Sequence, residues 1–423
     1  MIEYALSIIM KNGMDGIVKM ENNIEKQVKF FEEKIGIVKK WENVVMEIFM
    51  AGKNKKISFT IENPNKKKIK EAIERNLKLM EIMASSPYHG IQEKNDYVDN
   101  KIFDYDVIEN EKMIDIAEEV INNGGNAGIV FSSIDEIKIA NSNGVMMNDK
   151  NSMIYLSART FHKNYSFHDV SCSRSVKKID SRILKDAYEI LKDAKNEIKI
   201  KEGKYDVIFY PMAFANLISN IADFSSAFYV DAGYSFLANK IGKKVANDIL
   251  TIYDDGTCKD GIASRKFDDE GNATQKTIII KEGTLKNYIH NSMTAYKYKT
   301  KTTGNAGIIS PRPWNVIVKS GDYIIDEIIE DFKGLIITNL WYTRFQNYQN
   351  GDFSTVARDV AFYLENGEKK FVKGIRISDN IQHILENVEI LSKESKQIFW
   401  WEVENPVFAP YAMVKGVEIT KPS

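Results

Sequence analysis

Cysteine is scarce in this chain of 423 residues, which contains only Cys172 and Cys258. The two stand far apart and neither belongs to a Cys-x-x-Cys pair, so the sequence offers no disulfide framework and no cysteine-rich zinc site. Long apolar runs are missing too, because no stretch approaches the roughly 18 apolar residues of a membrane-spanning helix. The N-terminal residues, which include Glu3, do not resemble a secretory signal. We therefore expect a soluble, cytoplasmic protein with free thiols and no membrane contact.

An excess of one charge sign is also missing. The 58 lysines and arginines nearly balance the 59 aspartates and glutamates, for a formal net charge of −1. Such a chain has no overall field to attract nucleic acid or anionic lipid, so neither is expected as a direct partner. Hydrophobic residues make up 43% and charged residues 28%, as in globular proteins with a large core. At this length, two or three domains are expected.

Histidine occurs five times, and no histidine is followed directly by a glutamate. The five are His89, His162, His168, His290 and His383. The segment between His162 and His168 is typical of a hairpin turn, and we interpret both as surface histidines beside that hairpin. The acidic runs at residues 254–255 and 268–270 lack the regular spacing of a cation-binding loop, and we interpret them as solvated turns. The sequence therefore predicts no catalytic residue and no metal ligand in this chain.

A hydrolase that works without metal needs a nucleophile and a base, and hydroxyl groups are available at residues 171–173, 225–226 and 302–303. No Gly-x-Ser-x-Gly turn surrounds them. The Gly-x-x-x-x-Gly-Lys-Ser/Thr pattern that cradles phosphate is absent as well. Because distant residues can meet in space, a self-sufficient hydrolase stays an alternative at this stage.

Two α+β units are predicted in the first half of the chain. In residues 1–84, a helix at 2–12 is followed by short strands and by a second helix at 66–84. The strands are expected at 16–21, 25–31, 35–42, 44–51 and 55–60, each bounded by polar or glycine residues. Residues 85–106, rich in Pro, Gly, Asn, Asp and Tyr, are expected to form a linker.

The second unit, residues 107–197, repeats this order of elements. A helix at 109–122 precedes the strands, and a helix at 181–195 closes the unit. The strands are expected at 127–132, 136–141, 145–148, 152–160 and 164–173. The repeated order favours an internal duplication of a helix, an antiparallel meander and a covering helix. No strand leads into a glycine-rich loop, so neither unit is expected to bind a nucleotide.

Residues 203–423 are predicted to form a mostly antiparallel β domain with a few helices. Pro211 is well placed to begin a helix at 212–223. Near the end of the chain, Ser378 is a candidate N-cap for a helix at 379–391, whose apolar residues recur at helical spacing. The whole chain is thus expected to be an α+β protein.

Several short motifs of this last domain stand in a fixed order. They are Phe267 to Gly271 (FDDEG), Thr302 to Ala306 (TTGNA), Gly334 to Thr338 (GLIIT), Gly351 to Ser354 (GDFS), Glu365 to Glu368 (ENGE) and a Gly-Ile-x-Ile stretch at 374–380. In this order they resemble the C-terminal domain of the TldD/PmbA family. The resemblance is strong over residues 205–420, and over residues 1–195 it rests on the order of elements.

The family has two branches, which differ in their zinc ligands. In the TldD branch, a helix near the start of this domain carries His-Glu-x-x-x-His, whose histidines can face one zinc ion while the glutamate acts on the attacking water. The matching helix here, residues 212–223, has no histidine, glutamate or cysteine. The chain therefore resembles the PmbA (TldE) branch, which implies that zinc is expected in a TldD-type partner and that no cofactor is expected in this chain.

This resemblance implies a function. The chain is expected to be the non-catalytic subunit of a TldD/TldE-type zinc metallopeptidase complex that degrades or processes unfolded or short peptides. Family members are linked to maturation of peptide antibiotics and to modulation of DNA gyrase. The alternatives are a homodimeric binding or scaffold protein without peptidase activity, and the self-sufficient hydrolase.

A surface for peptide or partner is expected where aromatic residues and arginine gather, because these residues anchor interfaces. Ordinary core packing is the alternative explanation, and edge strands beside such residues are candidates to accept an extended peptide. The candidates are Phe228, Tyr229, Thr303, Gly304, Asn305, Trp341, Arg344, Phe345, Gly351, Asp352 and Phe353.

Overall fold

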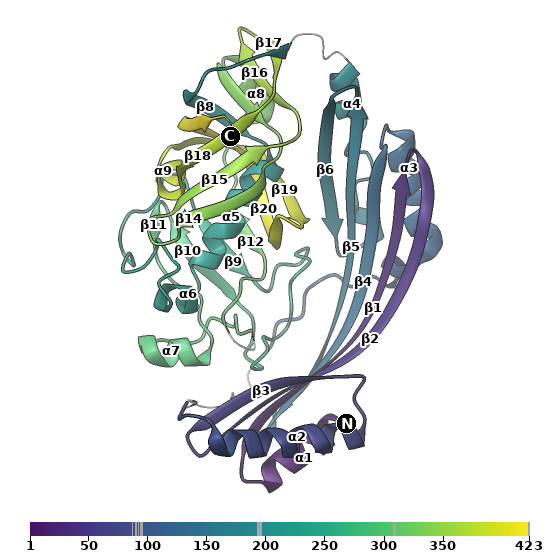
Figure 1. Ribbon diagram of the computed structural model, residues 1–423, viewed down its shortest axis with the longest axis vertical. Helices are drawn as coiled ribbons and strands as arrows, with labels where there is room; N and C mark the ends of the chain where they lie inside the picture. The colour runs from purple at the N-terminus through teal and green to yellow at the C-terminus, as the bar shows by residue number, and fades with distance from the viewer. Residues whose placement is uncertain are drawn as a thin grey trace.

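The computed structural model describes residues 1–421 except 87, 89, 90, 92, 94, 95, 193–196, 308 and 309. Two layers stand side by side in Figure 1. One is a long, curved antiparallel sheet from the N-terminal half, and the other is the β-rich C-terminal domain. The α+β class expected from the sequence is confirmed.

The N-terminal sheet has the order β3-β2-β1-β4-β5-β6 among the described strands. Its strands are β1 Asp15–Phe31, β2 Lys34–Gly52, β3 Lys55–Glu62, β4 Ala127–Asn141, β5 Met146–His162 and β6 Tyr165–Ser173. β1 pairs with β4 from Phe31 opposite Ala127 to Ile17 opposite Asn141. The two α+β units that the sequence predicts therefore contribute three strands each to one sheet.

Four of these strands each join two of the predicted strands. The strands expected at 16–21 and 25–31, for example, form the single strand β1. Asn22 and Asn23 looked like a break in the sequence, yet both pair in register with β2 and β4, and the Asn23 side chain donates to Asp135 of β4. A polar pair that finds ladder partners on both sides continues a strand instead of ending it.

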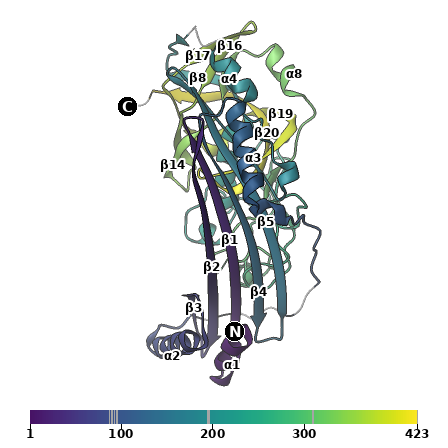
Figure 2. The ribbon, with the colours of Figure 1, turned by 90° about the vertical axis from the view of Figure 1, so that its right-hand side faces the viewer.

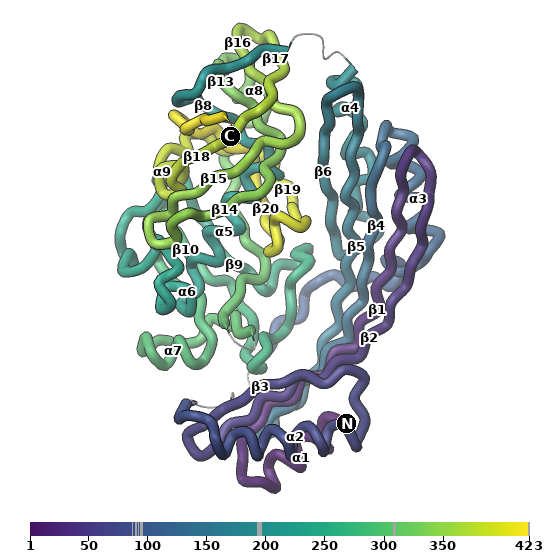
Figure 3. Tube along the Cα trace, in the orientation of Figure 1, coloured from purple at the N-terminus to yellow at the C-terminus, as the bar shows by residue number. Residues whose placement is uncertain are grey.

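Helices cover the two ends of this sheet. α1 Ile2–Lys11 and α2 Lys66–Ile82 enclose one small core at the lower end, where Figure 3 shows them beside the N-terminus. α3 Asn110–Asn122 lies over the outer face near the upper end, as Figure 2 shows, and α4 Lys185–Lys192 is near the top of Figure 1. The last residues of the helix predicted at 181–195 lie outside the described residues. No described helix combines the length and apolarity needed to cross a bilayer.

The C-terminal domain is built on a sheet of which β20 is a central strand. The described order is β11-β10-β9-β12-β20-β8-β13-β16-β17-β7, with β14, β15, β18 and β19 attached beside it. The strands are β7 Glu197–Ile198, β8 Gly203–Phe209, β9 Ile252–Asp255, β10 Lys276–Lys281, β11 Thr284–Leu285, β12 Val316–Val318, β13 Gly334–Ile337, β14 Trp341–Asn347, β15 Asp352–Ala357, β16 Ala361–Glu365, β17 Glu368–Val372, β18 Ile375–Asn380, β19 Val388–Trp400 and β20 Val403–Thr420.

The helix predicted at 379–391 is much shorter in the structure. β18 runs to Asn380, whose side chain caps α9 Ile381–Glu386 by accepting from the backbone N–H groups of Gln382 and His383. Val388 already begins β19 and pairs with Val414 of β20. The apolar residues after position 387 have a strand partner, so the sequence pattern alone placed the end of the helix too late. The other helices of the domain are α5 Pro211–Phe224, α6 Ala227–Asp231, α7 Ser292–Tyr298 and α8 Ile325–Glu330.

Helix α5 lies inside the C-terminal domain. It begins with Pro211, where a missing N–H costs nothing, and every residue except Asn220 and Asp223 is buried. The helix packs against β20 in the largest hydrophobic cluster of the molecule. Asn216 has no access to solvent and donates to the backbone oxygen of Glu402, while its side-chain oxygen accepts from Thr343. The helix therefore serves as core in this chain.

Candidate functional site

Two cavities lie between the N-terminal sheet and the C-terminal domain. The upper cavity, of about 360 Å³, is next to the first turn of α5, and its walls include Phe167, Asp169, Arg182, Tyr210, Lys396 and Tyr411. The lower cavity, of about 410 Å³, has a more apolar wall that includes Lys56, Tyr88, Phe228, Glu270, Asn291 and Met293. The interface between the two layers is thus the hollowed region to which both halves of the chain contribute.

One buried carboxylate joins the two layers at the upper cavity. The Asp359 side chain is fully buried and accepts from Arg159 Nη2 at 3.2 Å, Asn339 Nδ2 at 2.9 Å and Trp341 Nε1 at 3.3 Å. Its other oxygen accepts from Ser166 Oγ at 2.7 Å. A buried charge is tolerated when donors replace its water, so this set of contacts fixes β5 and β6 against the C-terminal domain.

His168 lies beside this carboxylate, in contact with a serine. Its Nε2 is 2.8 Å from Ser157 Oγ, and its Nδ1 is 3.2 Å from Asn339 Nδ2. Asp359 accepts hydrogen bonds only, so the amide nitrogen of Asn339 must face it, and the same nitrogen then donates to Nδ1 of His168. The proton of the imidazole is therefore on Nε2 and points at Ser157, the reverse of what a nucleophile and its base require.

The surroundings also keep His168 uncharged. Burial and, to a lesser extent, the nearby Arg159 guanidinium lower the pKa of His168 to about 3. The prediction that His168 is a surface histidine is wrong, since its side chain is 6% exposed. His162 ends β5 at the hairpin, as expected, and His89 lies outside the described residues.

The acidic turns are buried instead of solvated. Asp254 accepts from Asn305 Nδ2 and from the Trp314 N–H, both at 2.6 Å, and burial raises the pKa of Asp254 to about 7. Asp268 and Glu270 share the amide of Asn272, and burial raises the pKa of both carboxyl groups. In the part of the chain that the structure describes, no three His, Cys, Asp or Glu side chains come together as metal ligands could.

Three of the predicted surface residues lie in the interior. Thr303 Oγ1 accepts from the backbone N–H of His290, and Asn305 binds Asp254. Between them, Gly304 has φ +67°, and a Cβ there would lie 2.2 Å from the backbone oxygen of Ala273. These residues brace a loop, and their side chains do not reach solvent as a binding surface would.

The hairpin of β14 and β15 carries the other predicted group. Trp341 lies at the base of this hairpin under two arginines, with the guanidinium carbons of Arg159 and Arg358 at 5.1 Å and 4.6 Å from its ring. Arg344 is 3.7 Å from Glu402. Phe353 is core, Gly351 adopts φ +86° at the turn, and Asp352 accepts from Asn380.

The turn of this hairpin meets α6 on the surface. Phe224, at the end of α5, contacts Phe345 at 4.8 Å between ring centroids, and Tyr348 contacts both Phe345 and Tyr234. Phe228 and Tyr229 of α6 are 40% and 36% exposed. We name the exposed residues Phe228, Tyr229, Tyr234 and Tyr348 the aromatic patch. The structure thus brings predicted residues from distant segments to one region and adds Tyr234 and Tyr348.

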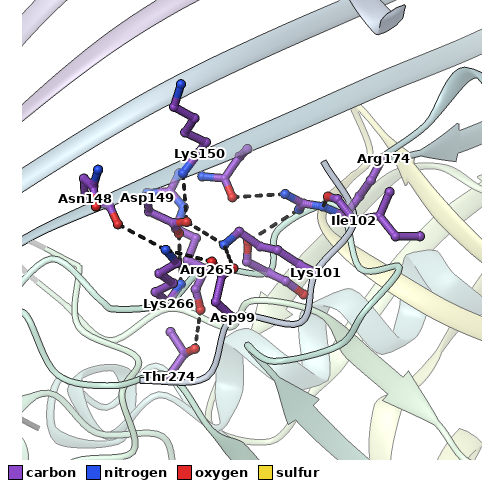
Figure 4. A network of polar contacts seen from close by, with 12 residues as sticks. Asp99, Lys101, Ile102, Asn148, Asp149, Lys150, Arg174, Arg265, Lys266 and Thr274 are labelled. Carbon is purple, nitrogen blue, oxygen red and sulfur yellow. Dashed lines mark hydrogen bonds and ion pairs between the residues drawn. The ribbon is translucent and has the colours of Figure 1, made fainter. Parts of the chain in front are cut away.

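A network of charges holds the linker and the C-terminal domain on β5 (Figure 4). Arg174 is fully buried and donates to Ile102 O, to Asn151 Oδ1 and to backbone oxygens of residues 261, 262 and 264. Lys101 bridges Asp99 and Asp149, at 2.8 Å and 2.5 Å. Sequence reasoning missed this network and the Asp359 contacts, because their members stand up to 200 positions apart and share no local motif.

A third connection lies lower in the interface. Lys19 of β1 is buried and its Nζ is 2.8 Å from Asp269 and 2.5 Å from Glu47. Lys19 and Arg312 lower the pKa of Asp269, although its burial acts in the opposite direction. This carboxylate is thus held as an anion between the sheet and the C-terminal domain.

The site does not fit a zinc ion on α5. The side chains of this helix are apolar or amide except Ser219 and Asp223, and none is a histidine, glutamate or cysteine. Asn216, which is buried, already uses its amide to hold Glu402 and Thr343. This helix therefore offers no ligands for a metal ion that would activate water.

Comparison with known proteins identifies relatives over part of the chain. The chain is 32% identical to a metalloprotease of Methanocaldococcus jannaschii over 51% of this chain and 50% of that protein. It is 30% identical to a homologue of the metalloprotease PmbA from Buchnera aphidicola over 65% of this chain and 58% of that protein. These alignments thus span about half of the length of each relative.

Solved structures share the fold over the whole chain. TldE from Thermococcus kodakarensis superimposes with a TM-score of 0.89 at 21% identity, with 99% of both chains covered. A proposed modulator of DNA gyrase from Thermotoga maritima gives a TM-score of 0.86, also at 21% identity and 99% coverage of both chains. Residues 202–421 match the model of the PmbA/TldA metallopeptidase C-terminal domain, and the chain belongs to the PmbA/TldD family.

Proposed function

We propose that this chain is the non-catalytic, TldE-like subunit of a TldD/TldE-type zinc metallopeptidase complex that degrades or processes unfolded or short peptides. The observation that carries the proposal is the chemistry of α5. This helix occupies the place at which the TldD branch has its His-Glu-x-x-x-His motif, and here its side chains are apolar or amide except Ser219 and Asp223, with no histidine, glutamate or cysteine. The catalytic zinc is therefore assigned to a TldD-type partner.

The geometry of Ser157 and His168 supports the same assignment. Ser157 and His168 are adjacent, but the hydrogen bond from Asn339 directs the imidazole proton toward the serine. A nucleophile needs a base that accepts its proton, and this pair lacks one. The self-sufficient hydrolase is thus the weaker of the alternatives.

The proposal gives the chain a role in enclosing and presenting peptides. The upper cavity lies between β6, the edge strand of the N-terminal sheet, and the start of α5. It contains charges of both signs, including Asp169, Arg182 and Lys396. Peptide recognition through backbone groups of an edge strand is tolerant of sequence, which suits a complex that takes unfolded chains.

The experiment is a zinc analysis and a peptidase assay on the purified chain, on a TldD-type subunit, and on their mixture, with an unstructured peptide as substrate. We expect zinc and cleavage in the mixture and neither in this chain alone. A TldD-type subunit with Gln in place of the Glu of its motif is the matched control, because it should still bind this chain and should not cleave. Stoichiometric zinc or cleavage in the isolated chain would overturn the proposal.

The same purified proteins distinguish the homodimeric scaffold from the proposed function. If the chain forms a stable homodimer and does not bind a TldD-type subunit at micromolar concentration, the scaffold alternative replaces the proposed function. Sedimentation velocity of the chain alone and of the mixture distinguishes the two outcomes.

A further inference from the structure

The hairpin of β1 and β2 has an exposed edge that no described strand covers. β3 pairs with β2 only from Val45 to Gly52, and the last contact above it is the N–H of Asn63 donating to Val44 O. Residues 34–43 of β2 continue the ladder with β1 and have no described strand on their other side. Figure 2 shows this upper part of β2 at the free margin of the sheet.

Apolar side chains are exposed along this edge. Ile37, Val38 and Trp41 are 41%, 49% and 38% exposed, and Phe31 at the end of β1 is 66% exposed. Single exposed apolar residues are common on protein surfaces, but a group of them beside unpaired backbone groups marks a site of strand pairing. We call residues 34–43 together with Phe31 the free edge.

The register shows which face of the sheet these side chains occupy. Phe31 is opposite Ala127, and Ala127 is opposite Arg159, whose guanidinium reaches Asp359 of the C-terminal domain. Ile37 is opposite Lys29, two residues before Phe31, and so lies on this same inner face. A strand added at the free edge would extend the inner face outward from the groove between the two layers (Figure 1).

The backbone groups available for pairing follow from the alternation of a strand. Val44 directs its carbonyl away from β1 toward Asn63, and in a β-strand every second residue directs its N–H and C=O to the same side. Lys40 and Glu42 therefore present their N–H and C=O groups outward. Lys39 and Trp41 direct theirs toward β1.

We propose that the free edge receives an extended, acidic strand of the partner subunit, which continues the N-terminal sheet across the subunit boundary. This inference rests on the proposed function, because it names the surface through which the TldD-type subunit binds. Residues 34–43 contain Lys34, Lys39 and Lys40 and one acidic residue, Glu42, which pairs with Lys40, so that Lys34 and Lys39 leave a net positive charge on this strand. The charge of the edge thus favours carboxylates opposite it.

A permanent partner suits this surface better than a transient peptide. A long unpaired edge with exposed Ile, Val and Trp side chains promotes aggregation when it is left open. Pairing with a constitutive subunit keeps the edge covered throughout the life of the protein. A peptide substrate would leave it open in every resting complex.

The test is a set of edge variants whose affinity for the TldD-type subunit is measured by biolayer interferometry with the full-length chains. Lys40→Pro removes one outward N–H and leaves the ladder to β1 intact, as prolines on edge strands do. We expect binding to weaken about 10-fold or more, because the partner carbonyl loses its donor. Lys40→Ala is the matched control, since it retains the N–H, and it should weaken binding less than Lys40→Pro.

A second variant tests the apolar contacts without changing the backbone. The double substitution Ile37→Ser and Trp41→Ser should also weaken binding, whereas Ile82→Ser, at an exposed position on α2, should not. Thermal unfolding of each variant shows that the fold persists. In the wild-type complex, residues 34–43 should exchange amide hydrogen more slowly than in the isolated chain.

The outcomes separate this inference from the proposed function. If the wild-type chain binds its partner and the mixture cleaves peptide, while the edge variants bind equally well, the free edge is not the docking surface and the proposed function stands. If the isolated chain dimerises and Lys40→Pro makes it monomeric, a second copy occupies the edge and the acidic partner strand is wrong. If no TldD-type subunit binds the wild type, the proposed function itself fails.

Discussion

Asp359 shows how one side chain can hold two layers of a protein together. Its donors come from β5, β6 and the segments around β13 and β14. Among these contacts, loss of the one with Arg159 should cost the most free energy, because Arg159 is the charged donor. We expect Asp359→Ala to lower the free energy of unfolding by about 3 kcal/mol, because it leaves the Arg159 guanidinium, whose side chain is 20% exposed, without its counter-ion. Asp359→Asn retains one acceptor oxygen and should cost less. Urea denaturation followed by tryptophan fluorescence measures both, and equal losses would contradict the account.

His168 predicts an acid-sensitive fold. Its pKa is about 3 in the folded chain because of burial and about 6.5 in an unfolded one. Above pH 6.5 the histidine is neutral in both states and its stabilising contribution is complete. As the pH falls from 6.5 toward 3, the unfolded chain gains a proton that the folded chain does not, so stability falls by about 1.4 kcal/mol per pH unit.

The substitution His168→Gln isolates this effect. The variant has no titrating group at this position, so the difference in unfolding free energy between wild type and variant should shrink as the pH falls from 6.5 to 4. Denaturation curves at four pH values provide the comparison. A constant difference across this range would show that His168 is protonated in the folded protein.

Residue identity alone could not have located these sites. His168 was expected at the surface because it stands beside a hairpin, and its burial arises from Asn339 and Asp359, which are far away in sequence. The acidic turns misled for the same reason, since the donors that make Asp254 tolerable in the interior belong to residues 305 and 314. Long-range partners decide the burial of a polar group, and a single sequence does not contain them as a pattern.

At the scale of an element, the loop that contains Gly304 predicts a sharp difference between two glycines. Gly304 and Gly367 have similar positive φ angles, +67° and +76°, but a Cβ at Gly304 meets the backbone of Ala273, whereas nothing lies within 4 Å at Gly367. Gly367→Ala should cost about 1 kcal/mol from backbone strain alone. Gly304→Ala should cost more, by about 1–3 kcal/mol, because the loop must move. Melting temperatures of the two variants check this.

The elements themselves were largely readable from sequence. The helix that begins at Pro211 and the strands of the N-terminal sheet lie where the sequence pattern placed them, although four of these strands each join two predicted strands. The pattern failed where a polar pair, such as Asn22-Asn23, is accommodated by neighbours on both sides. It failed again after α9, where the apolar residues fit both a helix and a strand. There, pairing with β20 favours the strand.

At the scale of the whole molecule, several ion pairs fix the sheet on the C-terminal domain, among them Lys396 with Asp169, and two others lie near different cavities. Arg159 with Asp359 acts near the upper cavity, and Lys19 with Asp269 acts near the lower one. If each suffices to hold the arrangement, Asp269→Asn and Asp359→Asn should separately leave the radius of gyration in small-angle scattering unchanged. The double variant should increase it. An unchanged radius in the double variant would assign the arrangement to the Arg174 network and to apolar packing.

The family could be recognised from the sequence because its motifs follow one another at fixed places in one domain. Four of these motifs contain a glycine whose φ angle is positive in the structure, namely Gly271, Gly304, Gly351 and Gly367. The arrangement of two predicted units in one sheet was not readable, because pairing between β1 and β4 joins segments separated by some hundred residues. The free edge was unreadable for the same reason, since only the topology shows that β3 stops short of it.

The central place of β20 has a consequence for how the protein is made. This strand, residues 403–420, pairs with β8, β12, β18 and β19, yet it is translated after all four of them. At about 5–20 residues per second, the β-rich domain spends many seconds without the strand on which its sheet is built. The N-terminal sheet ends at residue 173 and can form early in translation, whereas the sheet of the C-terminal domain closes only once residues 403–420 have emerged. Chains cut short before residue 403 should therefore depend on chaperones and be removed by proteolysis.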